Sequence, residues 1–338
     1  MIAQNNRMKA RPHHRVLLDT NIWRYVADEA ALPDLLKVAR DNQVHIQVAP
    51  SVLYEALASG DPDLRRRLVF VLTDPHWKRL MPEAYSESQE LLDEIRSLRP
   101  NWIRMDPDHT LYRRLRFDWT RSKGSCWDRA RREPDLAAEA IATHNGDTLI
   151  RARTAAKCNR DTHRSFHFNM QSIQNATVEP AYPILGWHGD RIEFWRGTGC
   201  SSTIRALRMR GHPYVDWLSG EVDIPLILRD AESWTQFWFY DVRPDLMSRF
   251  WIRGTFEYLQ SFRKITDGSP GDVQLATYLR ESDLFLTADK AFVEIAECCR
   301  QSAPFHMAHT HLIPGGRKGV DCLLSRLSVG SESKSRDN

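Results

Sequence analysis

The segment that most constrains this chain is residues 16–23, Val-Leu-Leu-Asp-Thr-Asn-Ile-Trp. Its three consecutive apolar residues predict a short strand buried on both faces, because a half-exposed strand would alternate polar and apolar residues. The apolar run stops at Asp19, and Thr20 and Asn21 follow with the short polar side chains that begin helices. A carboxylate is thus expected at the carboxyl end of a parallel strand, where open α/β sheets bind ligands. Taken alone, Asp19 is explained more simply as a helix cap.

The segments after this strand predict alternating helices and strands. Residues 22–39 have a helical pattern that Pro33 is expected to divide, and residues 44–48 alternate like a second strand. A helix over residues 52–58 then carries Glu55 in its first turns. This order predicts the start of a doubly wound α/β sheet.

Regular patterns return towards the C-terminal end. Helices are predicted over residues 255–265 and 269–280, and strands over residues 283–287 and 305–313. Asp289 comes two residues after the first of these strands. The end of a second strand is therefore expected to carry a carboxylate, as the first one does.

The middle of the chain differs in charge from the rest. The formal net charge is only +3, yet residues 96–164 contain 16 Lys or Arg against 9 Asp or Glu. Residues 61–164 read as mostly helical, with aromatic residues between the cations. Amphipathic helices usually present arginines as a solvated face. A phosphate-binding role is the alternative for Arg113, Arg114 and Arg116, which are clustered in one helical pattern.

Residues 165–250 show a less regular pattern. They contain several tryptophans among glycines and prolines, which suggests an irregular subdomain with its own small apolar cluster. A strand is expected over residues 192–196. No fold can be assigned to this region from its pattern.

Four carboxylates occupy comparable places in these predicted elements: Asp19, Glu55, Asp272 and Asp289. Each also has a structural explanation, since Asp289 fits a helix cap and Asp272 lies three residues after Ser269, as in a capping box. The structural explanation for Glu55 is a helix residue that faces solvent. The four acids in this order say more about the function of the chain than any one of them does alone.

This ordered set resembles the PIN-domain nuclease family. The resemblance covers roughly residues 14–60 and 254–313, and residues 272 and 289 are separated by seventeen positions, close to the spacing in that family. The matching segments are residues 16–21 (VLLDTN), 50–55 (PSVLYE), 272–276 (DVQLA) and 286–292 (LTADKAF).

The resemblance implies a three-layer α/β/α fold around a central parallel sheet. Residues 14–60 and 254–328 would form a discontinuous nuclease core, and residues 61–253 a large, mostly helical and irregular insertion. The insertion would recognise RNA or regulate the core. Residues 1–13 and 329–338 are expected to be disordered because they are short, polar terminal segments.

The four acids require a counter charge if they meet. Two carboxylates about 4 Å apart repel by roughly 4 kcal/mol at an effective dielectric constant near 20. Carboxylate oxygens are the ligands that Mg²⁺ and Mn²⁺ prefer, and such an ion activates water and stabilises phosphate charge. Asp19, Glu55, Asp272 and Asp289 are therefore the expected catalytic and metal-binding residues of a metal-dependent nuclease.

Neighbouring residues are expected to support these acids. Asn21 and Thr287 are candidates to orient carboxylates or water, with backbone capping as the alternative. Lys290 is a candidate phosphate contact, or simply a surface lysine. Many PIN proteins carry a further acid where this chain has Ala291, which leaves the occupancy of a second metal position open.

The resemblance favours RNA over DNA as substrate and allows a toxin-like or defence role. The expected partners are an RNA substrate, an antitoxin or other inhibitor protein, and a second copy of the chain in a homodimer. Six scattered cysteines without a CxxC pair suggest reduced thiols and a cytoplasmic protein. No apolar run is long enough to span a bilayer, so no membrane association is expected.

Two other functions compete with the nuclease. A phosphatase of the haloacid dehalogenase type also begins with an aspartate at a strand end, but it needs a second aspartate where this chain has Asn21. A non-catalytic PIN-like module that binds RNA or protein is the other alternative. A separate metal site at His306, His309 and His311 is not favoured, because no acid or cysteine accompanies them at ligand spacing.

Overall fold

A computed structural model describes residues 14–142, 153–154, 156–158, 160–161, 173, 176–266 and 268–329. The expected terminal disorder over residues 1–13 and 330–338 lies outside these residues, and residue 329 ends the last helix. The strands are β1 His14–Leu18, β2 Val44–Val48, β3 Lys78–Arg79, β4 Thr177–Val178, β5 Ile192–Glu193, β6 Leu284–Thr287 and β7 His309–Leu312. The first helices are α1 Thr20–Asp28, α2 Leu32–Asp41, α3 Pro50–Leu57, α4 Pro62–Leu72, α5 Glu83–Leu98, η1 Pro100–Trp102, α6 Thr110–Thr120, α7 Cys126–Arg132 and α8 Pro134–Ala142. The later helices are α11 Phe194–Arg208, α12 Pro213–Leu218, α13 Ile224–Arg229, α14 Ala231–Gln236, η2 Phe237–Asp241, α15 Ser248–Gln260, α16 Ser269–Ala276, η3 Thr277–Arg280, α17 Lys290–Ser302 and α18 Gly316–Val329.

A five-stranded parallel sheet forms the centre of the fold, with strand order β3-β2-β1-β6-β7. The chain moves from β1 to β2 in one direction and later places β6 on the other side of β1. The switch point of the sheet therefore lies between β1 and β6, where Leu18 is level with Leu286. Doubly wound sheets bind ligands outside the carboxyl ends of the strands at this point.

Helices pack around this sheet in two groups. Helices α1, α2 and α18 contact one another, whereas α15 contacts α16 and α17, and α17 contacts β7. Val16, Leu17 and Leu18 of β1 are fully buried, as are Phe285 and Leu286 of β6. This arrangement is consistent with a three-layer α/β/α fold, and it confirms the α/β class with a central parallel sheet.

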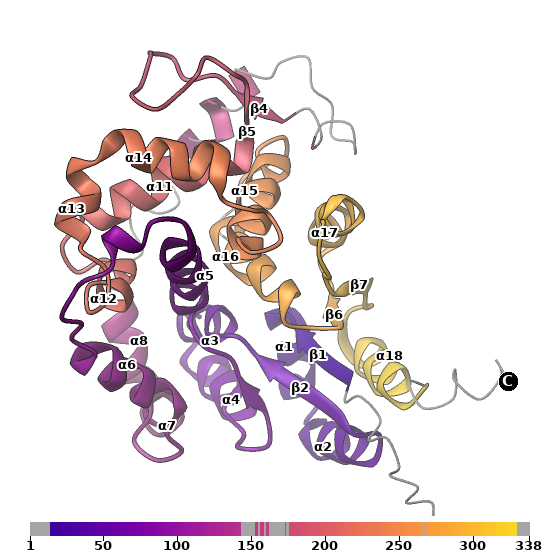
Figure 1. Cartoon of the computed structure of the whole chain (residues 1–338). Helices are drawn as coiled ribbons and strands as arrows, with labels where there is room; N and C mark the ends of the chain where they lie inside the picture. Colours follow the sequence, from indigo (N-terminus) through magenta and orange to yellow (C-terminus); the bar gives the residue numbers. More distant parts are fainter. Residues whose placement is uncertain are drawn as a thin grey trace, which may run out of the picture.

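The region expected to be irregular is largely helical. Helices α11, α12, α13 and α14 span much of residues 194–236, and the expected strand over residues 192–196 is only two residues long before α11 begins. The prediction of a separate apolar cluster was also wrong, because Trp195, Trp234 and Trp238 belong to the same continuous core as β1 and β6. In Figure 1, α11, α13 and α14 lie on the far side of α5 from strands β1 and β2.

Helix α15 joins this helical region to the sheet. The boundary expected between residues 253 and 254 falls inside α15, whose Trp251, Ile252 and Phe256 are all buried. At Gly254 the backbone of α11 comes so close that a Cβ would lie 2.8 Å from the Cα of Trp195. A larger residue at position 254 would push the two helices apart.

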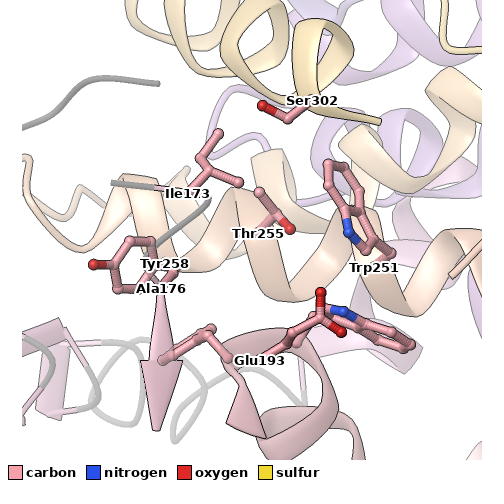
Figure 2. A pocket seen from close by; sticks show the side chains of 9 residues that line it. Ile173, Ala176, Glu193, Trp251, Thr255, Tyr258 and Ser302 are labelled. Carbon is pink, nitrogen blue, oxygen red and sulfur yellow. The ribbon is translucent and has the colours of Figure 1, made fainter. Parts of the chain in front are cut away.

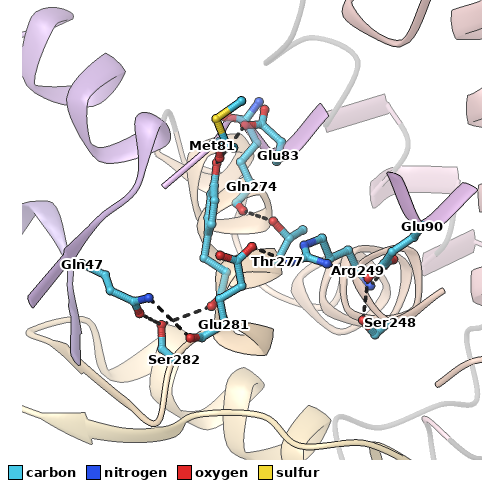
Figure 3. Close-up of polar contacts among 11 residues, drawn as sticks. Gln47, Met81, Glu83, Glu90, Ser248, Arg249, Gln274, Thr277, Glu281 and Ser282 are labelled. Atoms are coloured by element: carbon cyan, nitrogen blue, oxygen red, sulfur yellow. Dashed lines mark hydrogen bonds and ion pairs between the residues drawn. The ribbon is translucent and has the colours of Figure 1, made fainter. Parts of the chain in front are cut away.

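Partly buried polar contacts also connect α5 with the helices around the sheet (Figure 3). Arg249 of α15 pairs with Glu90 of α5 at 2.7 Å and also with Glu281, while Ser248 donates a 2.6 Å hydrogen bond to Glu90. Ser282 donates to the side chain of Gln47 in β2 at 2.8 Å. The sheet and the helices from the middle of the chain therefore pack as one body.

Of the helices in the described part of the chain, none has the length and apolar character needed to cross a membrane.

Candidate functional site

Asp19 lies at the carboxyl end of β1 and is the N-cap of α1. Its backbone N–H bonds Leu286 O of the neighbouring strand at 3.0 Å, and its Oδ1 accepts a 2.7 Å bond from Thr20 N. The residue is only 8% exposed. Burial, with a smaller contribution from the charge of Asp289, raises the pKa of Asp19 above its ordinary value. The capping role and the strand-end position therefore occur together.

Two predicted supporting residues contact Asp19 directly. Thr287, the last residue of β6, donates a hydrogen bond of 2.6 Å to Asp19 Oδ2, and Asn21 donates one of 3.2 Å to the same oxygen. The Thr287 hydroxyl also accepts a 2.9 Å bond from Asp289 N. Thr287 is fully buried, so these bonds hold the ends of the two strands in fixed relation.

Asp289 is the N-cap of α17. Its Oδ1 accepts bonds from Ala291 N at 2.6 Å and Phe292 N at 3.1 Å. Both carboxylates at the strand ends therefore have the plain structural role that the sequence suggests. One oxygen of Asp289, Oδ2, has no hydrogen-bond donor among the residues that the structure describes.

Glu55 approaches the same place from α3. Pro50 begins this helix, and Thr20 donates a 2.6 Å hydrogen bond from its hydroxyl to Glu55 Oε2. Burial, followed by the charge of Asp19, raises the pKa of Glu55, although the Thr20 bond opposes the rise. The expectation that the Thr20 side chain helps to cap α1 was wrong, because Asp19 is the N-cap and the Thr20 hydroxyl donates to Glu55 instead.

Asp272 completes the group from the first turn of α16. The capping box with Ser269 does not form, since Ser269 bonds Thr266 N and the Asp272 side chain accepts from Gln260 Nε2 at 3.4 Å. Burial and then the charges of Asp19, Asp289 and Glu55 raise the pKa of Asp272 to about 8. The structure therefore brings all four predicted acids into one electrostatic cluster, named here the acid cluster.

The donor chemistry of the acid cluster suits a hard divalent cation. Burial, and to a lesser extent the charges of neighbouring acids, raises the pKa values of Asp19, Glu55 and Asp272, so ionising all of these carboxylates together is unfavourable without a counter charge. Within the described ranges, Glu55 Oε1, Asp272 Oδ1 and Asp289 Oδ2 also lack hydrogen-bond donors. Carboxylate oxygens in this number fit Mg²⁺ or Mn²⁺ better than a softer metal.

The side chains are nevertheless not arranged as a ready coordination sphere. Across the residues that the structure describes, no three His, Cys, Asp or Glu side chains are grouped so that they could hold a metal ion as they stand. Several of the oxygens instead accept bonds from Thr20, Thr287 and the first N–H groups of α17. A cation would have to draw the carboxylates closer together.

The predicted phosphate contacts are divided between two places. Lys290, in the first turn of α17, is exposed and reaches Glu294 at 3.8 Å. Arg113, Arg114 and Arg116 lie on α6, a helix without buried residues that packs on α7 and α12. The link from α6 to the acid cluster is indirect, through the edge-on ring contact of Trp119 with Tyr54, the neighbour of Glu55.

Gln260 is the site residue that the sequence did not suggest. It is 8% exposed, ends α15 and directs its amide to Asp272. No local pattern marks it, because its partner lies twelve residues away beyond a turn. Its position depends on how α15 packs against α16.

Other candidate features do not join the acid cluster. His309 and His311 lie on β7, whereas His306 bonds Ser282 O at 3.1 Å, so the three histidines do not converge. Figure 2 shows a separate cavity of about 150 Å³ beside α11 and α15, lined by residues that include Glu193, Trp251 and Tyr258. It contains none of the four clustered acids.

Comparison of the chain with family models, with curated proteins and with solved structures finds no match. The fold and the acid cluster are therefore the basis for a functional proposal.

Proposed function

We propose that this chain is a PIN-like, Mg²⁺- or Mn²⁺-dependent ribonuclease that uses the acid cluster to hydrolyse RNA phosphodiester bonds. The observation that supports this most is the meeting of four carboxylates at the β1–β6 switch point, where burial and then the charges of the other three acids raise the pKa of Asp272 to about 8. Helix capping or an ion pair can explain one buried acid, but neither explains why four acids are placed together without a cation.

In this proposal the chain holds the acids and a divalent ion supplies the electrophilic chemistry, by activating water and offsetting phosphate charge. Thr287 and Asn21 fix the rotamer of Asp19, and Thr20 fixes that of Glu55. Gln260 orients Asp272. No Ser, Cys or His nucleophile is required.

RNA is proposed as the substrate because of the family resemblance and the cations around the site. Lys290 follows Asp289 directly, and the arginines of α6 offer a further exposed basic face. A toxin-like or defence role, an inhibitor protein and a homodimer rest on the resemblance alone.

The test is cleavage of end-labelled single-stranded RNAs of varied sequence by the full chain, with Mg²⁺, Mn²⁺ or EDTA. We expect cutting that depends on the divalent ion and that Asp19→Asn abolishes, since the substitution removes a charge but little volume. Asp223→Asn is the matched control, because Asp223 also caps a helix, α13, but lies outside the acid cluster.

Equal losses in Asp19→Asn and Asp223→Asn would mean that Asp19 is only a cap. No turnover by the parent protein with either ion would instead favour a non-catalytic module that binds RNA or protein. The phosphatase alternative is disfavoured because Asn21 donates its amide to Asp19 and carries no acidic proton for a leaving group.

A further inference from the structure

We propose that a second surface, the basic groove formed by Arg153, Lys157, Arg160, Phe262, Arg263 and Lys264, binds the backbone of single-stranded RNA and leads it to the acid cluster. The groove has a volume of about 540 Å³. The inference deepens the proposed nuclease function and rests on it.

Charge is the first argument for a phosphate ligand. Five of the residues that line the basic groove are cations, and none of its lining residues that the structure describes is an acid. Lys157 and Lys264 have no ion-pair partner among the described residues. Arg160 donates a 2.6 Å bond to the carbonyl of Ser261, which leaves its charge without a counter ion there. Cations without acidic partners, here Lys157, Arg160 and Lys264, attract polyanions.

Position is the second argument. One wall of the basic groove begins at Phe262, two residues after Gln260, the residue that contacts Asp272. Arg263 also pairs with Glu294 of α17, which in turn reaches Lys290, the residue after Asp289. Two separate series of contacts thus connect this groove with the acid cluster. The helix α6 with its arginines is linked to the acid cluster through the single ring contact of Trp119 with Tyr54.

The aromatic ring in the groove favours a single strand. Phe262 is half-buried, and its ring packs edge-on against Tyr258 at a centroid distance of 5.1 Å. A ring held in place beside cations is suited to stacking an unpaired base while the cations hold phosphates. A duplex would present its phosphates but not the faces of its bases.

The experiment measures binding separately from cleavage. A fluorescein-labelled single-stranded RNA of mixed sequence is titrated with the full chain in EDTA at several salt concentrations. The groove variant is Lys157→Glu/Lys264→Glu. Its control is Lys37→Glu/Lys318→Glu, which makes the same change of net charge at exposed lysines of α2 and α18.

We expect the groove variant to bind at least tenfold more weakly than the parent, and the control to stay within about twofold of it. The slope of log affinity against log salt should become shallower by about 0.7 for each RNA phosphate that the variant no longer neutralises. Equal affinities of the two double variants, no binding by the parent, or a preference of the parent for duplex DNA of the same length would each overturn the inference.

The two proposals fail in different ways. If RNA binds through the basic groove but is not cut with Mg²⁺ or Mn²⁺, the nuclease proposal is wrong and the groove remains an RNA-binding surface. If the groove variant and its control cut RNA equally well, the proposed role of the basic groove is wrong and the nuclease proposal remains.

Discussion

The hydroxyl of Thr287 donates a 2.6 Å hydrogen bond to Asp19 Oδ2 and thereby joins residues that are 268 positions apart in the chain. The same hydroxyl accepts a bond from Asp289 N, so one buried side chain contacts both strand-end acids. The parallel pairing of β1 with β6 brings these groups to the same level. The placement of the two acids is therefore fixed by the sheet, and not by a flexible loop.

Thr287→Val should slow RNA cleavage by about 10- to 100-fold, the usual cost of losing a group that orients a metal ligand. Valine keeps the shape and suits a strand, but it removes the bonds to Asp19 and Asp289. Thr310→Val is the control, since Thr310 lies on adjacent β7 beside Phe285 and its hydroxyl bonds Glu297. The measurement is the cleavage rate and the melting temperature of both variants. Equal cleavage rates for Thr287→Val and Thr310→Val would contradict the orienting role of Thr287.

The metal-free protein should become less stable as the pH rises. Asp272 has a folded pKa of about 8 against an ordinary value of 3.8, so the folded state binds more protons than the unfolded state between these values. Its contribution to stability is present at low pH and is lost as the pH approaches 8, with a slope of up to about 1.4 kcal/mol per pH unit.

The measurement for this second prediction is urea unfolding in EDTA between pH 5 and pH 8. Asp272→Asn removes the titrating group, so its stability should depend less steeply on pH than that of the parent. Parallel curves for the two proteins would show that the carboxylates do not strain one another. Added Mn²⁺ should stabilise the parent most at the higher pH, where the acids are ionised.

Neutralising the basic face of α6 should weaken RNA binding more than it slows chemistry. Arg113→Gln/Arg114→Gln/Arg116→Gln removes three exposed charges away from the acid cluster. We expect a higher KM, an unchanged kcat and a less steep dependence of affinity on salt. Unchanged binding, or a salt response equal to that of the parent, would remove α6 from the path of the substrate.

The ion pair between α5 and α15 should be important for stability. Arg253 contacts Glu87, which is fully buried and also accepts a bond from Tyr214. Arg253→Met leaves that carboxylate buried without its cation, at a cost of about 3–5 kcal/mol in the free energy of unfolding. Arg243→Met, which breaks the exposed pair with Asp245, is the control and should change nothing measurable in urea unfolding.

The sequence predicts β1, β2, β6 and β7 and the acids that follow β1 and β6 because both signals are local, whereas the two-residue strand β3 was not predicted. The apolar runs of β1 and β6 are buried; Asp19 follows β1 directly, and Asp289 lies two residues after the end of β6. A polar residue that ends an apolar run can be recognised in the sequence without knowing any contact between distant segments. Parallel pairing then brings the two ends together.

The remaining features depend on contacts between distant segments. Thr20 contacts Glu55 across 35 positions, and this bond competes with the local cap that the sequence suggests. The buried side of helix α11 includes the small residues Gly199 and Thr203 beside larger apolar ones, so its sequence shows little contrast between the buried and exposed faces. At Gly199 the ring of Trp238 occupies the space where a side chain would be, a relationship that periodicity cannot reveal.

Helix α15 has a consequence for any attempt to reduce this protein to a minimal enzyme. Its first half packs on α5 and α11 and its last residue contacts Asp272, so excising residues 61–247 would strip the apolar partners from a helix that positions an acid. A shortened version would expose Trp251 and Ile252 to water and release Gln260. The long middle portion is thus part of the scaffold on which the four acids depend, and not a detachable accessory.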